Sequence, residues 1–290
     1  MKRELLSVLL TAVGLFASTA ASAQVSGNIV KIGVLNDMSG PYADINGQGS
    51  VIAAEMAVKD YIKATHSKLK IEVVSADHQN KPDIGAVIAR KWYDINGVDV
   101  IIGVPNSSVA LAVNQIAREK GKALLAIGAA TTDLTGKDCS PSTINWAFDT
   151  WMLAHGTGSA VVKQGGDTWF FLTADYAFGH SLEHDTSEVV KASGGKVLGN
   201  VNVPFGEQDF SSALLQAQAS KAKIIGLAIS GSDLINAIKQ ASEFGITQSN
   251  QRLAGLMVFI SDVHSLGLQK AQGLLVTTPF YWDLDASTRT

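Results

Sequence analysis

The sequence predicts an α/β protein with two Rossmann-like lobes, each built on a parallel central sheet. Short apolar runs alternate along the chain with segments whose apolar residues recur at helical spacing, and this alternation is typical of parallel βαβ units. One set of such segments precedes residues 144–158 and a second set follows them. Because 290 residues exceed one typical α/β domain, we interpret the two sets as two lobes with a cleft between them.

The first strand–loop–helix unit shows this pattern most clearly. Residues 29–35 form an apolar run, a Gly-rich loop follows, and 50–64 has apolar residues at helical spacing. Ligands bind beside the carboxyl ends of strands in open α/β sheets, and this loop is long for such a connection. We therefore expect the loop, which contains Tyr42, to face a ligand. A decorated surface loop is the alternative.

The other elements follow the same alternation. Strands are predicted at 29–35, 70–76, 99–103, 123–127, 168–172, 196–200, 224–228 and 274–277. Helices are predicted at 50–64, 82–95, 108–120, 152–163, 181–192, 210–219 and 233–244. Pro82 suits a first helical turn, Gly121 and Gly245 follow helix ends where a positive φ is often needed, and Asp209 suits an N-cap.

The N-terminus has the features of a secretory signal peptide. Lys2 and Arg3 precede the apolar stretch 5–16, and small residues up to Ala23 fit a cleavage site. The stretch is too short to span a bilayer stably. We therefore expect residues 1–23 to be removed and the exported chain to begin at Gln24, a retained N-terminal anchor being the alternative.

Charge and cysteine content exclude several classes of protein. Removing Lys2, Arg3 and Glu4 with the leader changes the formal net charge from −3 to −4, which offers no electrostatic footprint for nucleic acid or an anionic membrane. No second apolar run approaches the ~20 residues that span a bilayer. Cys139 is the only cysteine, which excludes an internal disulfide. No histidine or acid is tied to it by local sequence, so we interpret it as a passive thiol.

Cofactor and metal motifs are weak. GxGxxG after the first strand and GxxxxGK[ST] are both absent, so no nucleotide cofactor is predicted. His180, Glu183 and His184 match the H-x-x-E-H pattern of inverted zinc peptidases, and both histidines would lie on one helix face. The third ligand would have to be Glu207 or Glu243, and neither sits in a supporting motif. We interpret the pattern as a polar helix start, with a zinc hydrolase as a remote alternative.

Two groups of small residues follow neighbouring predicted strands. Ser107 and Ser108 stand at a helix N-terminus, where hydroxyls and free backbone N–H groups form an anion site. Ala129 and Thr131 follow the next strand, one βαβ step further along the chain. Both groups should lie at the same sheet edge and could together hold a carboxylate without arginine or lysine. Helix capping alone explains the serines, but it explains the second group less well.

The order and spacing of several segments resemble the branched-chain amino-acid-type periplasmic solute-binding proteins, the type I receptors that feed ABC importers. The segments are KIGVLNDMSGPYADINGQGSVIAAEMAV, GVPNSSVALAV, AIGAATTDLTGKDCSP, TADYAFGHSLE, FGEQDFSSALLQAQASKAKIIGLAISGSDLINAIKQASEFGI and GLLVTTPFYWDLD, within residues 29–285. The resemblance implies a first lobe at 24–147, a second lobe at 148–277 and, at 278–290, the start of a return crossover. A small ligand would be trapped between the lobes by hinge closure.

The resemblance also implies which residues contact the ligand. Backbone and hydroxyl groups of the first lobe would hold its carboxylate, and side chains from both lobes would line the cleft. The implied residues are Tyr42, Ser107 or Ser108, Ala129, Thr131, Asp149 at the first crossover, Tyr176, and Ser230 or Gly231.

Two departures from the family pattern bear on the ligand. Amino-acid receptors of the family place an acid after a second-lobe strand, which would lie near residue 254 here, to bind the ligand ammonium, whereas this chain has Leu256 or Met257 there. An ammonium without a carboxylate partner is costly to desolvate, so an aromatic or keto acid rivals a leucine-like ligand unless Asp149 or Asp175 substitutes. Family members also run further along the chain and return to the first lobe, so we expect this sequence, which ends at Thr290, to be C-terminally truncated.

The expected function follows from the site and the resemblance. We expect a periplasmic, monomeric solute-binding component that captures a small carboxylate and delivers it to an ABC permease in the inner membrane. The ligand would be a branched-chain or other hydrophobic amino acid, or an aromatic or keto acid. No enzymatic activity, cofactor, metal or nucleic-acid partner is expected. A ligand-sensing receptor of the same fold is the alternative.

Overall fold

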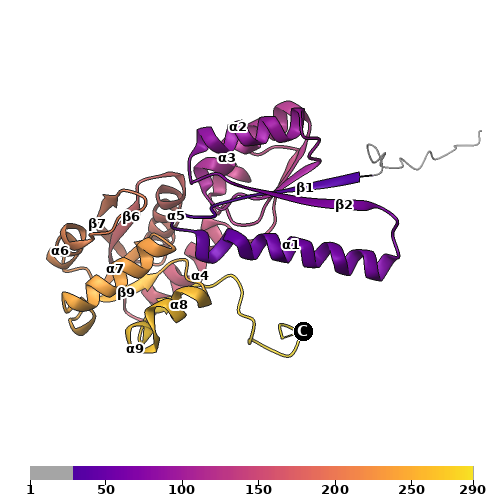
Figure 1. Cartoon of the computed structure of the whole chain (residues 1–290). Coiled ribbons are helices and arrows are strands. Elements are labelled where there is room, and N and C mark those ends of the chain that lie inside the picture. The colour runs from indigo at the N-terminus through magenta and orange to yellow at the C-terminus, as the bar shows by residue number, and fades with distance from the viewer. Residues whose placement is uncertain (1–28, 290) are drawn as a thin grey trace, which may run out of the picture.

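The computed structural model describes residues 29–289 and contains two five-stranded sheets (Figure 1). The strand orders are β2-β1-β3-β4-β5 and β10-β9-β8-β6-β7, and every pairing is parallel. The predicted α/β class with two Rossmann-like lobes is confirmed. The predicted signal peptide, residues 1–23, lies outside the described residues.

The first lobe is the part of the chain that builds the first sheet. Its elements are β1 (Ile29–Asn36), α1 (Ala43–Thr65), β2 (Lys70–Asp77), α2 (Pro82–Asp94), β3 (Val100–Gly103), α3 (Ser107–Lys120), β4 (Ala123–Ala126), the 3₁₀ turn η2 (Thr132–Leu134) and β5 (Thr143–Asn145). Pro82 occupies the start of α2, and Gly121 ends α3 with φ 59°, as the sequence predicts. These two residues fix where the helices on one face of the sheet begin and end.

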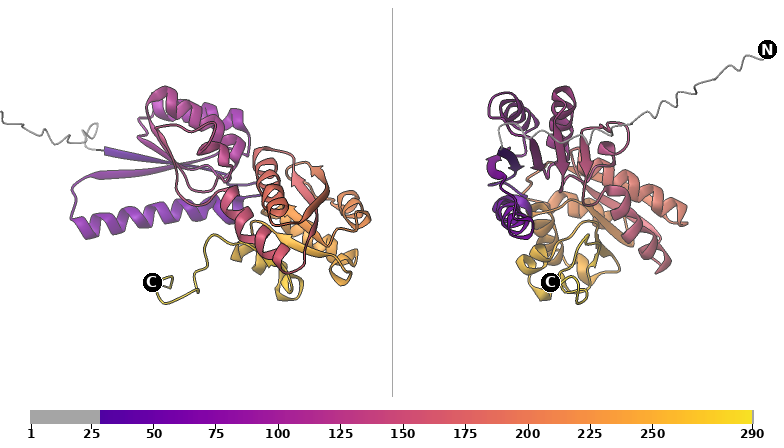
Figure 2. Two further views of the ribbon diagram at one scale, coloured as in Figure 1. Left: turned by 180° about the vertical axis from the view of Figure 1, so that it is seen from behind. Right: turned by 90° about the vertical axis from the view of Figure 1, so that its right-hand side faces the viewer.

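Helices α2 and α3 cover one face of the first sheet, and α1 lies along the other (Figure 2). The core on the α2–α3 side includes Trp92, Ile101 and Leu124, all buried. Gly33 on β1 is required there, because a Cβ atom at this position would stand 2.5 Å from the Trp92 ring. The close approach of α2 to the sheet therefore depends on a residue without a side chain.

The second lobe repeats this construction. Its elements are α4 (Thr150–Lys163), β6 (Thr168–Ala174), α5 (Ala177–Ala192), β7 (Lys196–Val203), α6 (Ser211–Ala219), β8 (Ile224–Ala228), α7 (Ser232–Glu243), the 3₁₀ turn η3 (Ile246–Gln248), β9 (Arg252–Gly255), α8 (Ile260–Leu266), α9 (Leu268–Ala271) and β10 (Leu275–Val276). Helices α4 and α5 bury one face around Trp169 and Leu182. Helices α6 and α7 bury the other around Phe210 and Ile238.

The structure departs from the predicted elements in two ways. The short elements β5, α8 and α9 were not predicted, because three to seven residues carry too little periodicity to distinguish them from a loop. β9 was expected only from the family resemblance, as a strand near residue 254. Helix α1 begins at Ala43 rather than at residue 50, and it bends at Gly47, whose ψ of −118° is not helical. The part of the Gly-rich segment from Ala43 onward thus belongs to the helix. Within residues 29–289, no helix is long and apolar enough to cross a membrane.

The carboxyl ends of strands in the two sheets face each other where the lobes meet. The backbone N–H of Ser232, which follows β8, donates to the carbonyl of Pro41, which follows β1, over 3.2 Å. Thr132, which follows β4, contacts Ser181 near the start of α5. The boundary between the lobes therefore lies where ligands bind in open α/β sheets.

Candidate functional site

Three aromatic side chains join the lobes on one side of this boundary. The hydroxyls of Tyr42 and Tyr176 form a hydrogen bond, and the Phe205 ring lies edge-on to both, with centroids 5.1 Å from each. Burial raises the pKa of both tyrosine hydroxyls, so both stay protonated. The structure thus brings together two predicted site residues from different lobes.

The turn that carries Tyr42 is held by a buried carboxylate. One oxygen of Asp37 accepts the Gly40 N–H over 2.7 Å, and the other accepts the Tyr42 N–H over 2.8 Å and the Asn80 amide over 2.6 Å. Asp37 is fully buried, so these bonds offset the cost of desolvating it. They fix the backbone that presents Tyr42 to the second lobe.

The predicted carboxylate site is assembled at the edge of the first sheet. Ser107 Oγ accepts the backbone N–H of Thr131 over 3.3 Å, which joins the two groups of small residues as their one-step spacing predicts. The Asn106 side chain caps α3 by accepting the Val109 N–H over 3.1 Å. In the described part of the chain, no acceptor takes the backbone N–H of Ser107, Ser108 or Ala129. These three donors, two of them at the positive end of the α3 dipole, can bind an anion.

An apolar cavity of about 440 Å³ lies between the lobes. Its lining residues come from both lobes, from the segment between β5 and α4, and from the segment after β10. They are Ile45, Asn46, Ile127, Gly128, Ala147, Phe148, Phe259, Ile260, Pro279 and Phe280. The rings of Phe148 and Phe259 lie 6.1 Å apart. None of the predicted site residues lines the cavity, but Gly128 and Phe148 directly precede Ala129 and Asp149. The volume is within the range of small-molecule sites.

Two other predicted residues have different surroundings. Asp149 accepts the Met152 N–H over 2.8 Å and so caps α4, which gives this carboxylate a structural role. Ser230 follows β8, is 2% exposed, and its Oγ has no hydrogen-bond partner among the described residues. Gly231 comes next with φ +64°, and a Cβ atom there would stand 2.4 Å from the Pro41 carbonyl oxygen. Leu256 and Met257 are buried and apolar.

Two buried acids of the second lobe were not predicted as site residues. Asp233, in the first turn of α7, accepts the Gly206 N–H over 2.9 Å, and burial raises its pKa to about 6. Asp262, in the first turn of α8, accepts the Phe259 N–H over 2.8 Å. Burial, with a smaller contribution from Asp44 of the first lobe, raises the pKa of Asp262 to about 6. Acids are common in first helical turns, so no sequence signal distinguishes these two.

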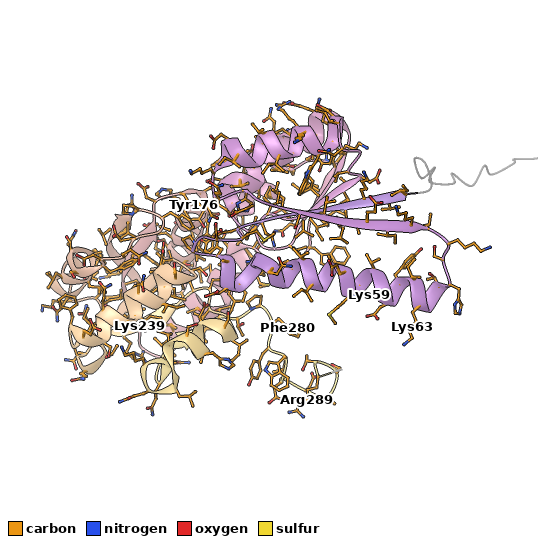
Figure 3. All side chains as sticks on the ribbon, viewed as in Figure 1. Lys59, Lys63, Tyr176, Lys239, Phe280 and Arg289 are labelled. Carbon is orange, nitrogen blue, oxygen red and sulfur yellow. The ribbon has the colours of Figure 1, made fainter. Side chains whose placement is uncertain are left out.

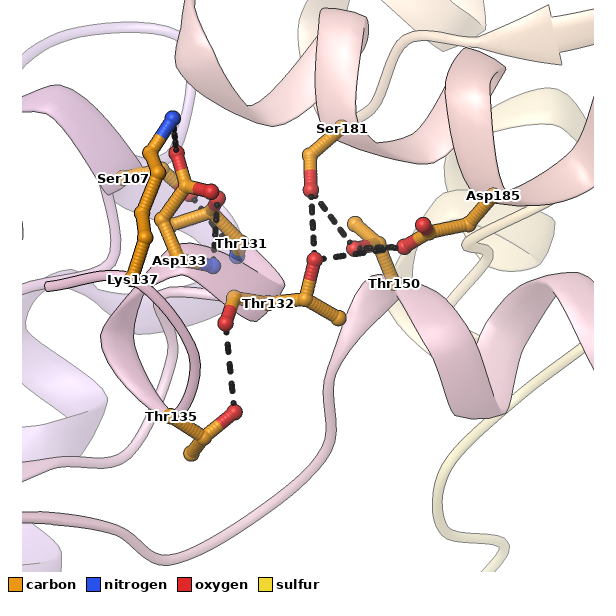
Figure 4. Close-up of polar contacts among 9 residues, drawn as sticks. All are labelled: Ser107, Thr131, Thr132, Asp133, Thr135, Lys137, Thr150, Ser181 and Asp185. Carbon is orange, nitrogen blue, oxygen red and sulfur yellow. Dashed lines mark hydrogen bonds and ion pairs between the residues drawn. The ribbon is translucent and has the colours of Figure 1, made fainter. Parts of the chain in front are cut away.

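A polar cluster connects the lobes near the first crossover (Figure 4). One oxygen of Asp185 on α5 accepts the Thr150 hydroxyl over 2.6 Å and the Thr132 hydroxyl over 3.4 Å. Ser181 Oγ lies 2.8 Å from the Thr150 hydroxyl and 3.1 Å from that of Thr132. The hydroxyl of a first-lobe residue is thus tied to α5 of the second lobe.

His180 and Glu183 of the H-x-x-E-H pattern contact different partners, and His184 is exposed. His180 Nε2 lies 2.9 Å from an Asp175 oxygen. Glu183 accepts the Thr173 hydroxyl over 2.6 Å and the Asn200 amide over 3.0 Å. Within residues 29–289, no group of three or more His, Cys, Asp or Glu side chains could hold a metal ion. Glu183 on α5 thus serves to attach the helix to β6, through Thr173, and to β7, through Asn200.

Comparison with known proteins places this architecture in a family. Residues 29–290 match the family model described as periplasmic binding protein. The Leu/Ile/Val-binding protein homolog 6 of Brucella melitensis is 26% identical, over 93% of this chain and 68% of its own length.

Two solved structures share the fold over 90% of this chain and 69% of their own. A periplasmic binding protein from Burkholderia mallei is 56% identical with a TM-score of 0.87. A branched-chain amino acid ABC transporter periplasmic ligand-binding protein from Burkholderia xenovorans is 38% identical with a TM-score of 0.75. The chain therefore belongs to the periplasmic binding protein family, in its type I branch of branched-chain amino-acid ABC transporters.

Proposed function

We propose that the protein is the periplasmic solute-binding component of an ABC import system and captures a small carboxylate with an apolar body. The observation that carries the proposal is the group of three free N–H donors, on Ser107, Ser108 and Ala129, together with the apolar cavity between the lobes, whose lining residue Gly128 directly precedes Ala129. A group of N–H donors that can bind an anion, together with an apolar cavity, matches a ligand with one carboxylate and a hydrocarbon body.

The physical chemistry of this site supplies affinity without a cationic side chain. Hydrogen bonds to a charged group contribute roughly 1.5–3 kcal/mol each, and burying apolar ligand surface contributes about 25 cal/mol per Å². Closure of the lobes removes the ligand from water on both sides. Binding energy of this kind supports capture and release, which is what a transport component requires.

Proteins of this fold bind two relevant ligand classes. The Burkholderia xenovorans protein serves a branched-chain amino acid transporter. A Rhodopseudomonas palustris solute-binding protein in complex with benzoate shares the fold at 23% identity and a TM-score of 0.76. Both classes carry a carboxylate and an apolar body, and they differ in the ammonium group. The apolar side chains of Leu256 and Met257 favour a ligand without an ammonium.

The rest of the proposal concerns processing and partners. We place the lobes at 24–147 and 148–277, with residues 1–23 removed after Ala23 on export. The closed, monomeric protein would present both lobes to an inner-membrane permease. A ligand-sensing receptor would use the same cleft, and a permease encoded beside this protein would favour transport.

The carboxylate site is tested by Thr131→Ala, with Thr135→Ala as the matched control. Thr131 is buried beside Ser107, and we propose that its hydroxyl donates to the carboxylate together with the three N–H groups, whereas Thr135 is an exposed threonine four residues further on. Calorimetric titration with benzoate and with leucine should show about tenfold weaker binding of the preferred ligand to Thr131→Ala and wild-type binding to Thr135→Ala. Thermal unfolding checks that both variants fold. Wild-type affinity in a folded Thr131→Ala variant would contradict the site assignment.

A further inference from the structure

The buried amide of Asn36 joins three segments at the carboxyl edge of the first sheet. Asn36 is the last residue of β1 and is fully buried. Its Oδ1 accepts the Val104 N–H over 3.1 Å, its Nδ2 donates to the Asn46 carbonyl, and its own carbonyl accepts the His78 N–H over 2.9 Å. Asn36 does not line the cavity between the lobes, so any effect that it has on a ligand is indirect.

Val104 is held in a backbone conformation that its side chain disfavours. Its φ is +55°, and it is the only β-branched residue with a positive φ in the described part of the chain. Such a conformation persists only where the surroundings impose it. Here the Val104 N–H donates both to the Leu35 carbonyl, over 2.9 Å, and to Asn36 Oδ1. Gly103 precedes it with φ +99°, and a Cβ atom there would stand 2.0 Å from Asn36 Oδ1. Asn36 and the glycine thus impose this turn on Val104.

The strained turn sets the position of the first two N–H donors. Ser107 and Ser108 follow Val104 after only two residues. The first of these, Pro105, has a restricted φ, and the second, Asn106, is fixed because its side chain caps α3. The segment between Val104 and the donors therefore has little freedom, so a change in the turn displaces both N–H groups.

The third donor, on Ala129, depends on the same contacts. The Gly103 carbonyl accepts the Ile127 N–H over 3.1 Å, which joins the strained turn to the segment that leads to Ala129. Asn46, whose carbonyl accepts the buried amide, packs against this segment from the other side, since its Oδ1 lies 3.0 Å from the position of a Cβ atom on Gly128. All three donors thus belong to backbone that the buried amide holds in place.

We propose that Asn36 is a positioning residue, which holds Val104 in the left-handed conformation and so sets the three N–H donors before the ligand arrives. Hydrogen bonds weaken steeply when their angle departs from the ideal, and donors that are set in advance need no ordering on binding. The inference rests on the proposed function, because it takes the N–H groups of Ser107, Ser108 and Ala129 to bind the carboxylate.

The first step of the test is Asn36→Ala, which removes both side-chain bonds. Neither partner loses its only bond, because the Val104 N–H keeps the Leu35 carbonyl. The Asn46 carbonyl likewise keeps the Ser50 hydroxyl. The variant should therefore fold, and its donors, no longer held, should bind the carboxylate about tenfold more weakly. Calorimetric titration with benzoate and with leucine measures this, for whichever of the two the wild type binds more tightly.

Rescue by glycine distinguishes positioning from a merely structural role. Asn36→Ala/Val104→Gly should bind within about threefold of the wild type, because glycine adopts a positive φ without a steric cost. Asn36→Ala/Val104→Ala is the matched control, since it also removes the buried valine side chain but keeps a Cβ atom. This control should stay about tenfold weaker than the wild type. If Asn36 only stabilised the fold, thermal unfolding would change among the variants and the affinity of the folded protein would not.

A measurement without ligand separates this inference from the proposed function. The amide NMR resonances of Ser107, Ser108 and Ala129 should shift in Asn36→Ala and return toward their wild-type positions with Val104→Gly, but not with Val104→Ala. If neither benzoate nor leucine binds the wild type, the proposed function is wrong, and these resonances alone decide whether Asn36 positions the donors.

The remaining outcomes decide the role of Asn36. Wild-type affinity or unshifted resonances in Asn36→Ala would overturn it and leave the carboxylate site standing. Equal rescue by glycine and alanine at residue 104, or rescue by neither, would overturn the role of the strained turn. If Asn36→Ala does not fold alone, folding and binding that are restored by Val104→Gly only would support the inference, and restoration by neither substitution would overturn it.

Discussion

The hydroxyl groups of Tyr42 and Tyr176 form a hydrogen bond across the two lobes, although the residues are 134 positions apart in the chain. Figure 3 shows Tyr176 where the lobes meet. Tyr42 is held by the Asp37 turn of the first lobe, and Tyr176 directly precedes α5 of the second. The pair therefore reports whether the lobes are in contact.

Removing this bond should favour separated lobes. Spin labels at Lys59 on α1 and Lys239 on α7, which lie on different lobes (Figure 3), would give the interlobe distance in a Cys139→Ser background. Tyr176→Phe should shift the distance distribution to longer values, because a bond of about 1 kcal/mol changes an open–closed equilibrium about fivefold. Tyr61→Phe, at an exposed position on α1, is the control. Superimposable distributions for all three proteins would contradict a role for the pair in closure.

Gly231→Ala should also open the lobes, for a steric reason. A Cβ atom at Gly231 would stand 2.4 Å from the Pro41 carbonyl oxygen and 2.9 Å from the Tyr42 ring. The first-lobe turn that contains Pro41 and Tyr42 could therefore not pack against residue 231 as it does in this structure. Gly245→Ala controls for backbone strain, since Gly245 has a similar φ of +68° and nothing within 4 Å of its Cβ position. The distance between the same two spin labels should increase in Gly231→Ala and stay unchanged in Gly245→Ala. Equal distances in both variants would show that the turn does not need this glycine.

The polar cluster at the first crossover should be energetically coupled. Asp185 accepts the Thr150 hydroxyl over 2.6 Å, so Asp185→Ala and Thr150→Ala each remove the same bond. A double-mutant cycle by urea unfolding should give a coupling of about 1 kcal/mol or more. Asp185→Ala paired with Thr65→Ala should be additive, because the exposed Thr65 hydroxyl bonds to Tyr61 and Ser67 and shares no partner with Asp185 within residues 29–289. Additivity in both cycles would mean that the cluster contributes no joint stability.

The buried carboxyl of Asp262 should make stability depend on pH. Its pKa is about 6 in the folded protein and 3.8 for an ordinary aspartate, so the folded state binds this proton more tightly. Its contribution is therefore largest at low pH and is lost as pH rises from about 4 to about 6, up to about 3 kcal/mol for a two-unit shift. His78, whose pKa burial lowers to about 4, acts in the opposite direction, which makes the comparison between variants essential.

The measurement for Asp262 is the free energy of unfolding at pH 4.5 and pH 7.5. The wild type should lose more stability between these values than Asp262→Asn, which cannot titrate at this position. Asp209→Asn is the control, because Asp209 is exposed and its hydrogen bonds to Ser211 lower its pKa, giving an effect of the opposite sign. Parallel profiles for the wild type and Asp262→Asn would contradict the assignment.

The sequence predicts the fold well because the elements that define it are long and periodic. Strand–helix alternation, Pro82 and Gly121 locate most helices and strands of both lobes. The spacing of Ser107 and Thr131 likewise predicts that they meet, because one βαβ step brings neighbouring strands to the same edge. These features depend on local pattern and on topology, which the sequence contains directly.

Other features depend on tertiary packing and could not be predicted. The short strand β5 forms because it pairs with β4. Asp233 looks like any acid in a first helical turn until the fold buries it. The residues that line the cavity are sequence neighbours of the predicted contact residues and not those residues themselves. Asp149, predicted to face the cleft, caps α4 instead. Volume and burial arise only when distant segments pack together.

The most direct test of a carboxylate-binding cleft is a thermal-shift comparison of matched ligands on the wild-type protein. Benzoate, 4-hydroxybenzoate, leucine and its keto acid would each be measured beside methyl benzoate, which keeps the ring but lacks the carboxylate. A ligand at 100 times its dissociation constant should add about 2.7 kcal/mol to stability. A rise in Tm with a free carboxylate and none with methyl benzoate is the expected result. A rise of equal size with methyl benzoate, or no rise with any carboxylate, would contradict the proposed site.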